Sequence, residues 1–135
     1  MPTTITHIFE AITYLLTQDH DVSTIVGTKV FNGWRPTKGA DAPCINHFEV
    51  ISTKMDFGLF SGCQLQINCW HTNYKSARQL ADAVVKKLNH YGGKVNGTFH
   101  IDALEYANRK DELVEPDVGL INVAVFFNCL YRADN

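Results

Sequence analysis

The segment Cys69-Trp70-His71 holds the residue types that come closest to a reactive site in this sequence. A thiol becomes a nucleophile when its pKa is lowered, and the start of a helix with a nearby imidazole base can do this. However, Cys69 belongs to an alternating apolar row, and neighbouring side chains on a strand point to opposite faces. It meets His71 only if the chain bends sharply, so we expect a core thiol. A Cys69-based enzyme or small-ligand module is the alternative from another class.

The other titratable residues match no spacing that is typical of a site. The six histidines form no H-E-x-x-H pattern, and the four cysteines form no C-x-x-C pattern. His100 and Asp102 share one face of a predicted strand and could pair, although such a surface pair is more often simply solvated. There is no phosphate-binding glycine motif and no G-x-S-x-G. We expect buried free thiols, no catalytic residue, no metal and no cofactor, hence an interaction protein rather than an enzyme.

Size and charge limit the classes of function. A chain of 135 residues with 45% apolar and 19% charged residues fits one globular domain, spanning residues 1–135. Such a domain is too small to enclose a DNA duplex, so a ring would need several copies. The net charge of −2 and the scattered Lys and Arg residues argue against tight nucleic-acid binding. We find no apolar run for a membrane span and no signal peptide, so we expect a cytosolic chain.

Apolar residues at helical spacing predict two main helices. The first helix follows Thr3 and Thr4, which are its candidate N-caps. Its predicted buried face is Ile5, Ile8, Phe9, Ile12, Leu15 and Leu16. A short helix follows, capped by Asp21. The second main helix begins after Thr72 or Asn73, and its buried stripe is Tyr74, Ala77, Leu80, Ala81, Val84 and Leu88.

Alternation and Gly/Pro positions predict the strands and loops. In one cleanly alternating strand, an apolar row faces away from Gln64, Gln66, Asn68 and Trp70, and this row is Cys63, Leu65, Ile67 and Cys69. The strongest strand pattern is the last one, with an unbroken apolar face of Ile121, Val123, Val125, Phe127, Cys129 and Tyr131. The strands are predicted over 28–34, 44–52, 63–70, 97–107 and 119–132, with an apolar hairpin tip over 53–61 and a charged loop over 105–118. The order of helix, strands, helix and strands predicts an α+β domain, with a mostly antiparallel sheet and two main helices packed on one face.

Three stretches together resemble a known family: "TIVGTKVFNGWRP" with "APCINHFEV", then "CQLQINCWHTNYKSARQLADAVVKKL", and "EPDVGLINVAVFFNCLYR". The shared features are a strand that ends near an aromatic residue, a T-x-Y-x-x-A-x-x-L-A-D-type helix and a closing P-x-x-G-L strand. This pattern is similar to the tail terminator, or tail completion, proteins of long-tailed bacteriophages and prophages. The cysteine content and Ile121 depart from the family pattern.

The resemblance implies a structural virion protein without catalytic activity. Members of the family are small α+β domains that form a ring, usually of six copies, which stops growth of the tail tube and joins the tail to the head connector. The implied partners are further copies of the chain, the tail tube protein and a head-tail connector or stopper protein. DNA would pass through the lumen without specific binding, and no membrane is involved. The implied location is the head-tail interface of the virion, after assembly in the host cytoplasm.

Two groups of residues are candidate contacts in such an assembly. Apolar groups at a loop tip either fold back onto the core or contact a partner. On the second alternative, we assign the subunit or tube interface to Met55, Phe57, Leu59 and Phe60, together with Trp34 and Arg35. The charged loop supplies candidate contacts around the ring or with the connector, namely Arg109, Lys110, Asp111 and Glu112. A solvated loop is the alternative for this second group. Another head-tail connector or tube-ring component is the alternative function.

Overall fold

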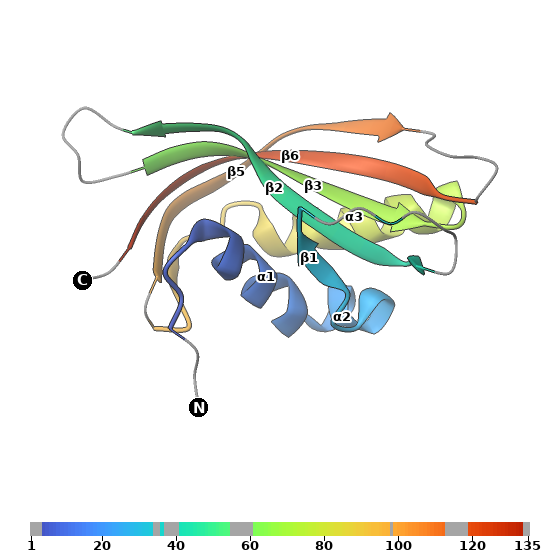
Figure 1. Cartoon of the computed structure of the whole chain (residues 1–135), viewed down its shortest axis with the longest axis horizontal. Coiled ribbons are helices and arrows are strands. Elements are labelled where there is room, and N and C mark those ends of the chain that lie inside the picture. The colour runs from blue at the N-terminus through green and yellow to red at the C-terminus, as the bar shows by residue number, and fades with distance from the viewer. Residues whose placement is uncertain are drawn as a thin grey trace.

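The computed structural model describes residues 4–33, 36, 41–54, 61–97, 99–112 and 119–133. Three helices cover one face of a single six-stranded sheet, as Figure 1 shows. In chain order the elements are α1 (Ile8–Gln18), α2 (His20–Val26), β1 (Val30–Asn32), β2 (Cys44–Lys54), β3 (Ser61–His71), α3 (Tyr74–Leu88), β4 (Gly93–Val95), β5 (Phe99–Glu112) and β6 (Ile121–Ala133).

The strand order across the sheet is β1-β2-β3-β6-β5-β4. Only the pairing of β1 with β2 is parallel, and the other four pairings are antiparallel. The sheet is strongly twisted, so that its strands cross like an X in Figure 1. The predicted α+β class, with a mostly antiparallel sheet and the main helices on one face, is confirmed.

The main core lies between the sheet and the helices α1 and α3. Strand β3 contributes the predicted row of Cys63, Leu65, Ile67 and Cys69, which is buried as expected. Strand β6 sets Val123, Val125 and Phe127 opposite that row. The helices add buried residues at helical spacing, which are Ile8, Ala11, Ile12, Leu15 and Leu16 from α1 and Ala77, Leu80, Ala81, Val84 and Leu88 from α3. The predicted burial is wrong for Tyr74, which is 40% exposed, and Phe9 is only half-buried.

Helix ends agree with the sequence in part. Helix α3 has Asn73 as its N-cap, whose side chain accepts a hydrogen bond from the Ser76 amide at 2.9 Å. The cap predicted for the short helix is wrong, because Asp19, and not Asp21, accepts from an amide of the first turn of α2. Helix α1 begins only at Ile8, three or four positions later than its predicted caps Thr4 and Thr3 would place it.

The predicted charged loop over 105–118 is wrong for its first half, since residues 105–112 belong to β5. Two register shifts, between Ile101 and Ala103 and between Tyr106 and Asn108, break the alternation of this strand. The first shift also turns Leu104 into the core in place of Ala103. A strand whose alternation is interrupted twice gives no clear period in the sequence, which explains the error.

Candidate functional site

The structure does not bring Cys69 and His71 together as a nucleophile and its base. Cys69 is fully buried on the helix-covered face of β3, and this burial raises the pKa of its thiol far above the usual range. His71 Nδ1 instead accepts a hydrogen bond from the Thr72 amide at 2.8 Å. A thiol that stays protonated at neutral pH is a poor nucleophile. The expectation of a core thiol is therefore confirmed for Cys69.

The other three cysteines are buried as well. All four thiols are buried and free. Burial raises the pKa of Cys44 to about 11. A hydrogen bond to Cys63, together with burial, raises the pKa of Cys129 still further. No group of three or more potential metal-ligating side chains occurs among the residues that the structure describes.

His100 and Asp102 do pair, as their spacing allowed. His100 Nε2 lies 3.2 Å from Asp102 Oδ1, and Arg132 Nε lies 3.6 Å from the same oxygen. The side chains of His100 and Asp102 are only 25% and 19% exposed, so the pair is more enclosed than the solvated pair we expected. Both partners of Asp102 come from strand ends at the rim of the sheet. The contacts join β5 to β6 and supply no nucleophile.

The charged end of β5 contacts helix α3. Arg109 Nη1 donates to Asp82 Oδ1 at 2.8 Å, and the Tyr74 hydroxyl donates to Asp111 Oδ2. Arg78 Nη1 donates to the Tyr74 hydroxyl at 3.2 Å, with its guanidinium 5.6 Å from the Tyr74 ring centre. Thus Arg109 and Asp111, two of the predicted assembly contacts, have partners inside the monomer. These contacts hold the end of β5 against the N-terminal half of α3.

The other predicted contact residues stay predictions. Lys110 lies on β5 and its side chain is exposed, whereas Glu112 is described only as part of the strand. Trp34 and Arg35 lie outside the described residues. The same holds for the apolar tip of the β2–β3 hairpin, namely Met55, Phe57, Leu59 and Phe60. The hairpin itself is present, because β2 and β3 pair up to Lys54 and Ser61.

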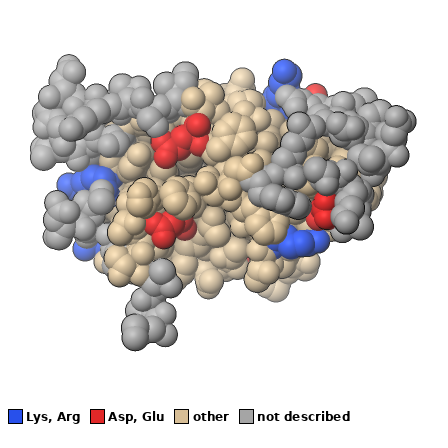
Figure 2. All heavy atoms as spheres, viewed as in Figure 1, with Lys and Arg blue, Asp and Glu red and all other residues tan. Residues whose placement is uncertain are grey.

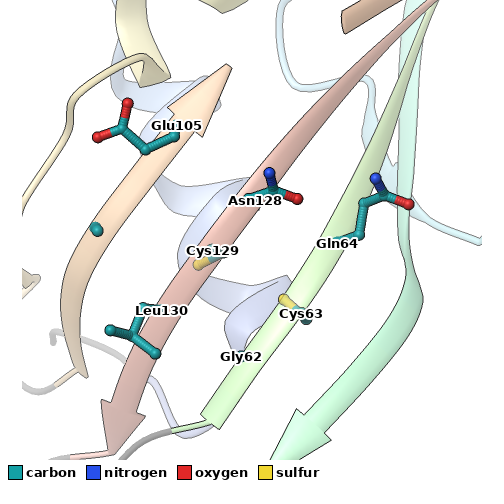
Figure 3. Close-up of a pocket in the computed structure, with 8 residues that line it drawn as sticks. Gly62, Cys63, Gln64, Glu105, Asn128, Cys129 and Leu130 are labelled. Carbon is teal, nitrogen blue, oxygen red and sulfur yellow. The ribbon is translucent and has the colours of Figure 1, made fainter. Parts of the chain in front are cut away.

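The sheet face away from the helices is polar and rich in amide side chains. At one end, a shallow pocket of about 440 Å³ opens over β5, β6 and β3. Figure 3 shows Glu105, Asn128 and Gln64 side by side on these three strands, with Leu130 at the end of the pocket. The carboxylate and the two amides can hydrogen-bond to a partner, whereas the two thiols that also line the pocket, Cys63 and Cys129, are buried. The pocket is therefore a candidate contact surface and not a candidate active site.

At the other end of this face, buried amides form a network that sequence reasoning missed. Trp70 Nε1 donates to Asn46 Oδ1 at 2.6 Å, and both residues are buried. Asn68 Oδ1 accepts from Gln66 Nε2 at 2.9 Å and from Asn122 Nδ2 at 3.2 Å. Trp70 also belongs to a second apolar cluster, with Cys44 and Leu120. The alternation placed these residues on the polar face, but gave no sign that they are buried.

Charge is sparse on the surface seen in Figure 2. In that view the basic side chains lie near the ends of the molecule, and acidic side chains lie between them. A dispersed pattern of this kind is unlike the basic stripe of a protein that grips phosphates. None of the described helices is long and apolar enough to cross a membrane.

Two comparisons relate this geometry to known proteins. Residues 10–132 match the family described as "Tail completion protein gp17". The fold is similar to that of a chain in the virion of a native gene transfer agent particle, with a TM-score of 0.72 and 16% sequence identity, covering 93% of this chain and 94% of that chain. No curated protein matches the sequence. Since the family match extends over nearly the whole domain, from α1 to β6, the chain belongs to the Tail completion protein gp17 family.

Proposed function

We propose that this protein is a non-catalytic structural subunit of a phage-type tail, and that its copies form a ring which completes the tail tube and joins it to the head connector. The observation that carries the proposal is the family match over residues 10–132. The similar fold of a chain in a gene transfer agent virion agrees with it. The sequence pattern resembles that of ring-forming tail terminators, for which six copies are usual, and we propose the same number here.

The chemistry of the described residues supports a structural function. The one thiol placed near an imidazole in the sequence is buried and protonated. The charged residues of β5 make contacts with α3 that fix the fold. A ring with a net charge of −2 per copy would hold DNA weakly, since tight binding requires many cations to displace counterions together. The DNA could then pass through the lumen.

Electron microscopy of the purified protein mixed with purified tail tubes tests the proposal. We expect one ring at one end of each tube, and we expect capped tubes to stop growing when fresh tube protein is added. A tube subunit would instead be incorporated along the whole length, which would favour the alternative of a tube component. A protein that never associates with tubes or connectors, or that turns over a substrate as a monomer, would overturn the proposal.

A further inference from the structure

Both edges of the sheet are only partly covered. Strand β1 pairs with β2 at three positions, the last being Asn32 with His47, while β2 continues to Lys54. Strand β4 pairs with β5 only up to Ile101, while β5 continues to Glu112. In the part of the chain that the structure describes, no other strand lies beside these two continuations. Long uncovered edges readily pair with another chain, so proteins usually cover them.

The register shows which backbone groups point outward on β2. The Ile45 amide bonds to Lys29 O and the His47 carbonyl accepts from the Gly33 amide, so odd-numbered residues point toward β1. The register shift between Glu49 and Ile51 adds one residue and reverses this order. Beyond it, Ser52 and Lys54 therefore point their amide and carbonyl groups away from β3. We call the segment 50–54 the β2 edge.

The same reasoning locates the open stretch of β5. The Leu104 carbonyl accepts from the His90 amide at 2.8 Å, and the Tyr106 amide donates to Asn89 Oδ1 at 3.0 Å. The link after α3 therefore covers the middle of this edge. After the register shift between Tyr106 and Asn108, the outward residues are Arg109 and Asp111. We call the segment 108–112 the β5 edge.

We propose that the β2 edge of one copy pairs with the β5 edge of the next copy as antiparallel strands, so that one sheet runs from subunit to subunit. The inference rests on the proposed ring, and it names the surfaces that would form it. The two edges belong to different strands, so the contact is head-to-tail, which is the type that closes into rings. Strands β2 and β5 run in opposite directions within the sheet, so continuing the sheet makes the new pair antiparallel.

The positions of the edges also determine an offset between copies. Across the sheet, Ser52 is paired with Cys63, Cys63 with Cys129, and Cys129 with Leu104, so Ser52 and Leu104 lie at the same level. The outward carbonyl of Leu104 already accepts a hydrogen bond from the His90 amide. Two copies at the same level therefore cannot pair by these edges, and one copy must be shifted along the strand direction relative to the other. Placing Ser52 beside Asp111 moves the neighbour about six residues along the strand, or roughly 20 Å. Figure 1 agrees, because the ends of β2 and β5 lie at opposite sides of the molecule.

Exposure on the β2 edge supports this pairing. Val50 lies at the register shift and is 43% exposed. Among the described residues, it is one of three large apolar residues with an exposed side chain. An apolar side chain at the rim of an open strand is covered when another strand docks there. Neither β1 nor β4 obstructs the offset pairing. Strand β1 covers β2 only as far as His47, and β4 covers β5 only as far as Ile101.

Cysteine cross-linking of assembled rings tests the pairing. With Ser52 beside Asp111, the register places Thr53 opposite Lys110, and a slide of two residues toward the end of β5 places Thr53 opposite Glu112. Rings of Thr53→Cys/Lys110→Cys or of Thr53→Cys/Glu112→Cys should give covalent oligomers on mild oxidation. The matched control is Thr53→Cys/Asn128→Cys, because Asn128 lies in the middle of the sheet and should give none.

A proline variant provides the second measurement. Ser52→Pro removes an outward amide without removing a β2–β3 hydrogen bond, so the monomer should keep its circular dichroism spectrum while association weakens at least tenfold. Ser52→Thr keeps the amide and should assemble normally. If rings form at tube ends but neither cysteine pair cross-links and Ser52→Pro assembles normally, the edge pairing is wrong and the proposed function stands. If no variant and no unmodified protein forms rings, both are wrong.

Discussion

His47 makes the stability of the protein depend on pH in a way that can be calculated. Its side chain lies on the helix-covered face of β2 and is fully buried. Its Nε2 lies 2.8 Å from Thr13 Oγ1 of α1, while its buried Nδ1 has no hydrogen-bond partner among the described residues. Burial lowers the pKa of the ring from 6.5 to about 4. The folded protein therefore binds this proton less readily than the unfolded chain does.

The sign and size of the effect follow from proton linkage. Because the folded pKa is the lower one, the stability is fully present above pH 6.5 and is lost as the pH falls toward 4. Lowering the pH from 7 to 5 should reduce the free energy of unfolding by about 2 kcal/mol, and full protonation by about 3 kcal/mol. For a domain of this size, about 2 kcal/mol corresponds to a fall in Tm of roughly 7 °C.

Urea unfolding at pH 7 and pH 5 measures the effect, with His47→Gln as the test variant. Glutamine can still bond to Thr13 but does not titrate, so the difference between the two pH values should shrink by about 2 kcal/mol. The readout is this difference and not the absolute stability, which the substitution also changes. His20→Gln, at an exposed position of α2, is the control and should keep the full difference. Equal pH dependence in His47→Gln and the unmodified protein would refute the assignment to His47.

Three further predictions concern assembly, reactivity and stability. Changing Phe57 and Phe60 to Ser should abolish ring formation on tail tubes and leave the monomer folded by circular dichroism; unchanged assembly would remove the hairpin tip from the interface. Iodoacetamide at neutral pH should label Cys69 only after unfolding, and rapid labelling of the native protein by mass spectrometry would revive the enzyme alternative. Asn73→Ala should cost about 1 kcal/mol in urea unfolding, whereas Asn73→Asp should keep the cap and most of the stability.

The sequence predicted those parts of the fold in which one period runs without interruption. The apolar row of β3, the apolar face of β6 and the stripe of α3 each repeat over several turns or residue pairs, so the burial of most of their residues was predicted correctly. Tyr74, at the start of α3, is an exception, because it is 40% exposed. Strand β5 was missed over 108–112 because two register shifts break its alternation and because Arg109 and Asp111 occupy its helix-side positions. These charges are tolerated there because Asp82 and Tyr74 are within reach, and that pairing depends on the tertiary fold.

The residues of the candidate site also divide into those that a sequence period predicts and those whose environment depends on the tertiary fold. Reading the alternation was enough to assign Cys69 to the core and to reject it as a nucleophile. The amides of Asn46 and Asn68 were placed on the correct face, but their burial could not be inferred, because it depends on segments distant in the sequence. Hydrogen bonds between distant residues, such as the one from Trp70 to Asn46, leave no periodic signal in a sequence.

The arrangement of the core suggests that folding and assembly can be separated in this protein. The main core is confined to the side of the sheet that carries α1 and α3. The pocket over β3, β5 and β6 lies on the opposite side, and the uncovered edges of β2 and β5 lie at the margins. Side chains outside the main core contribute little to the free energy of unfolding, since most stabilisation comes from buried apolar area. Substitutions at the edges should therefore change the association of copies while each copy remains folded, which is the property that makes the ring experiments interpretable.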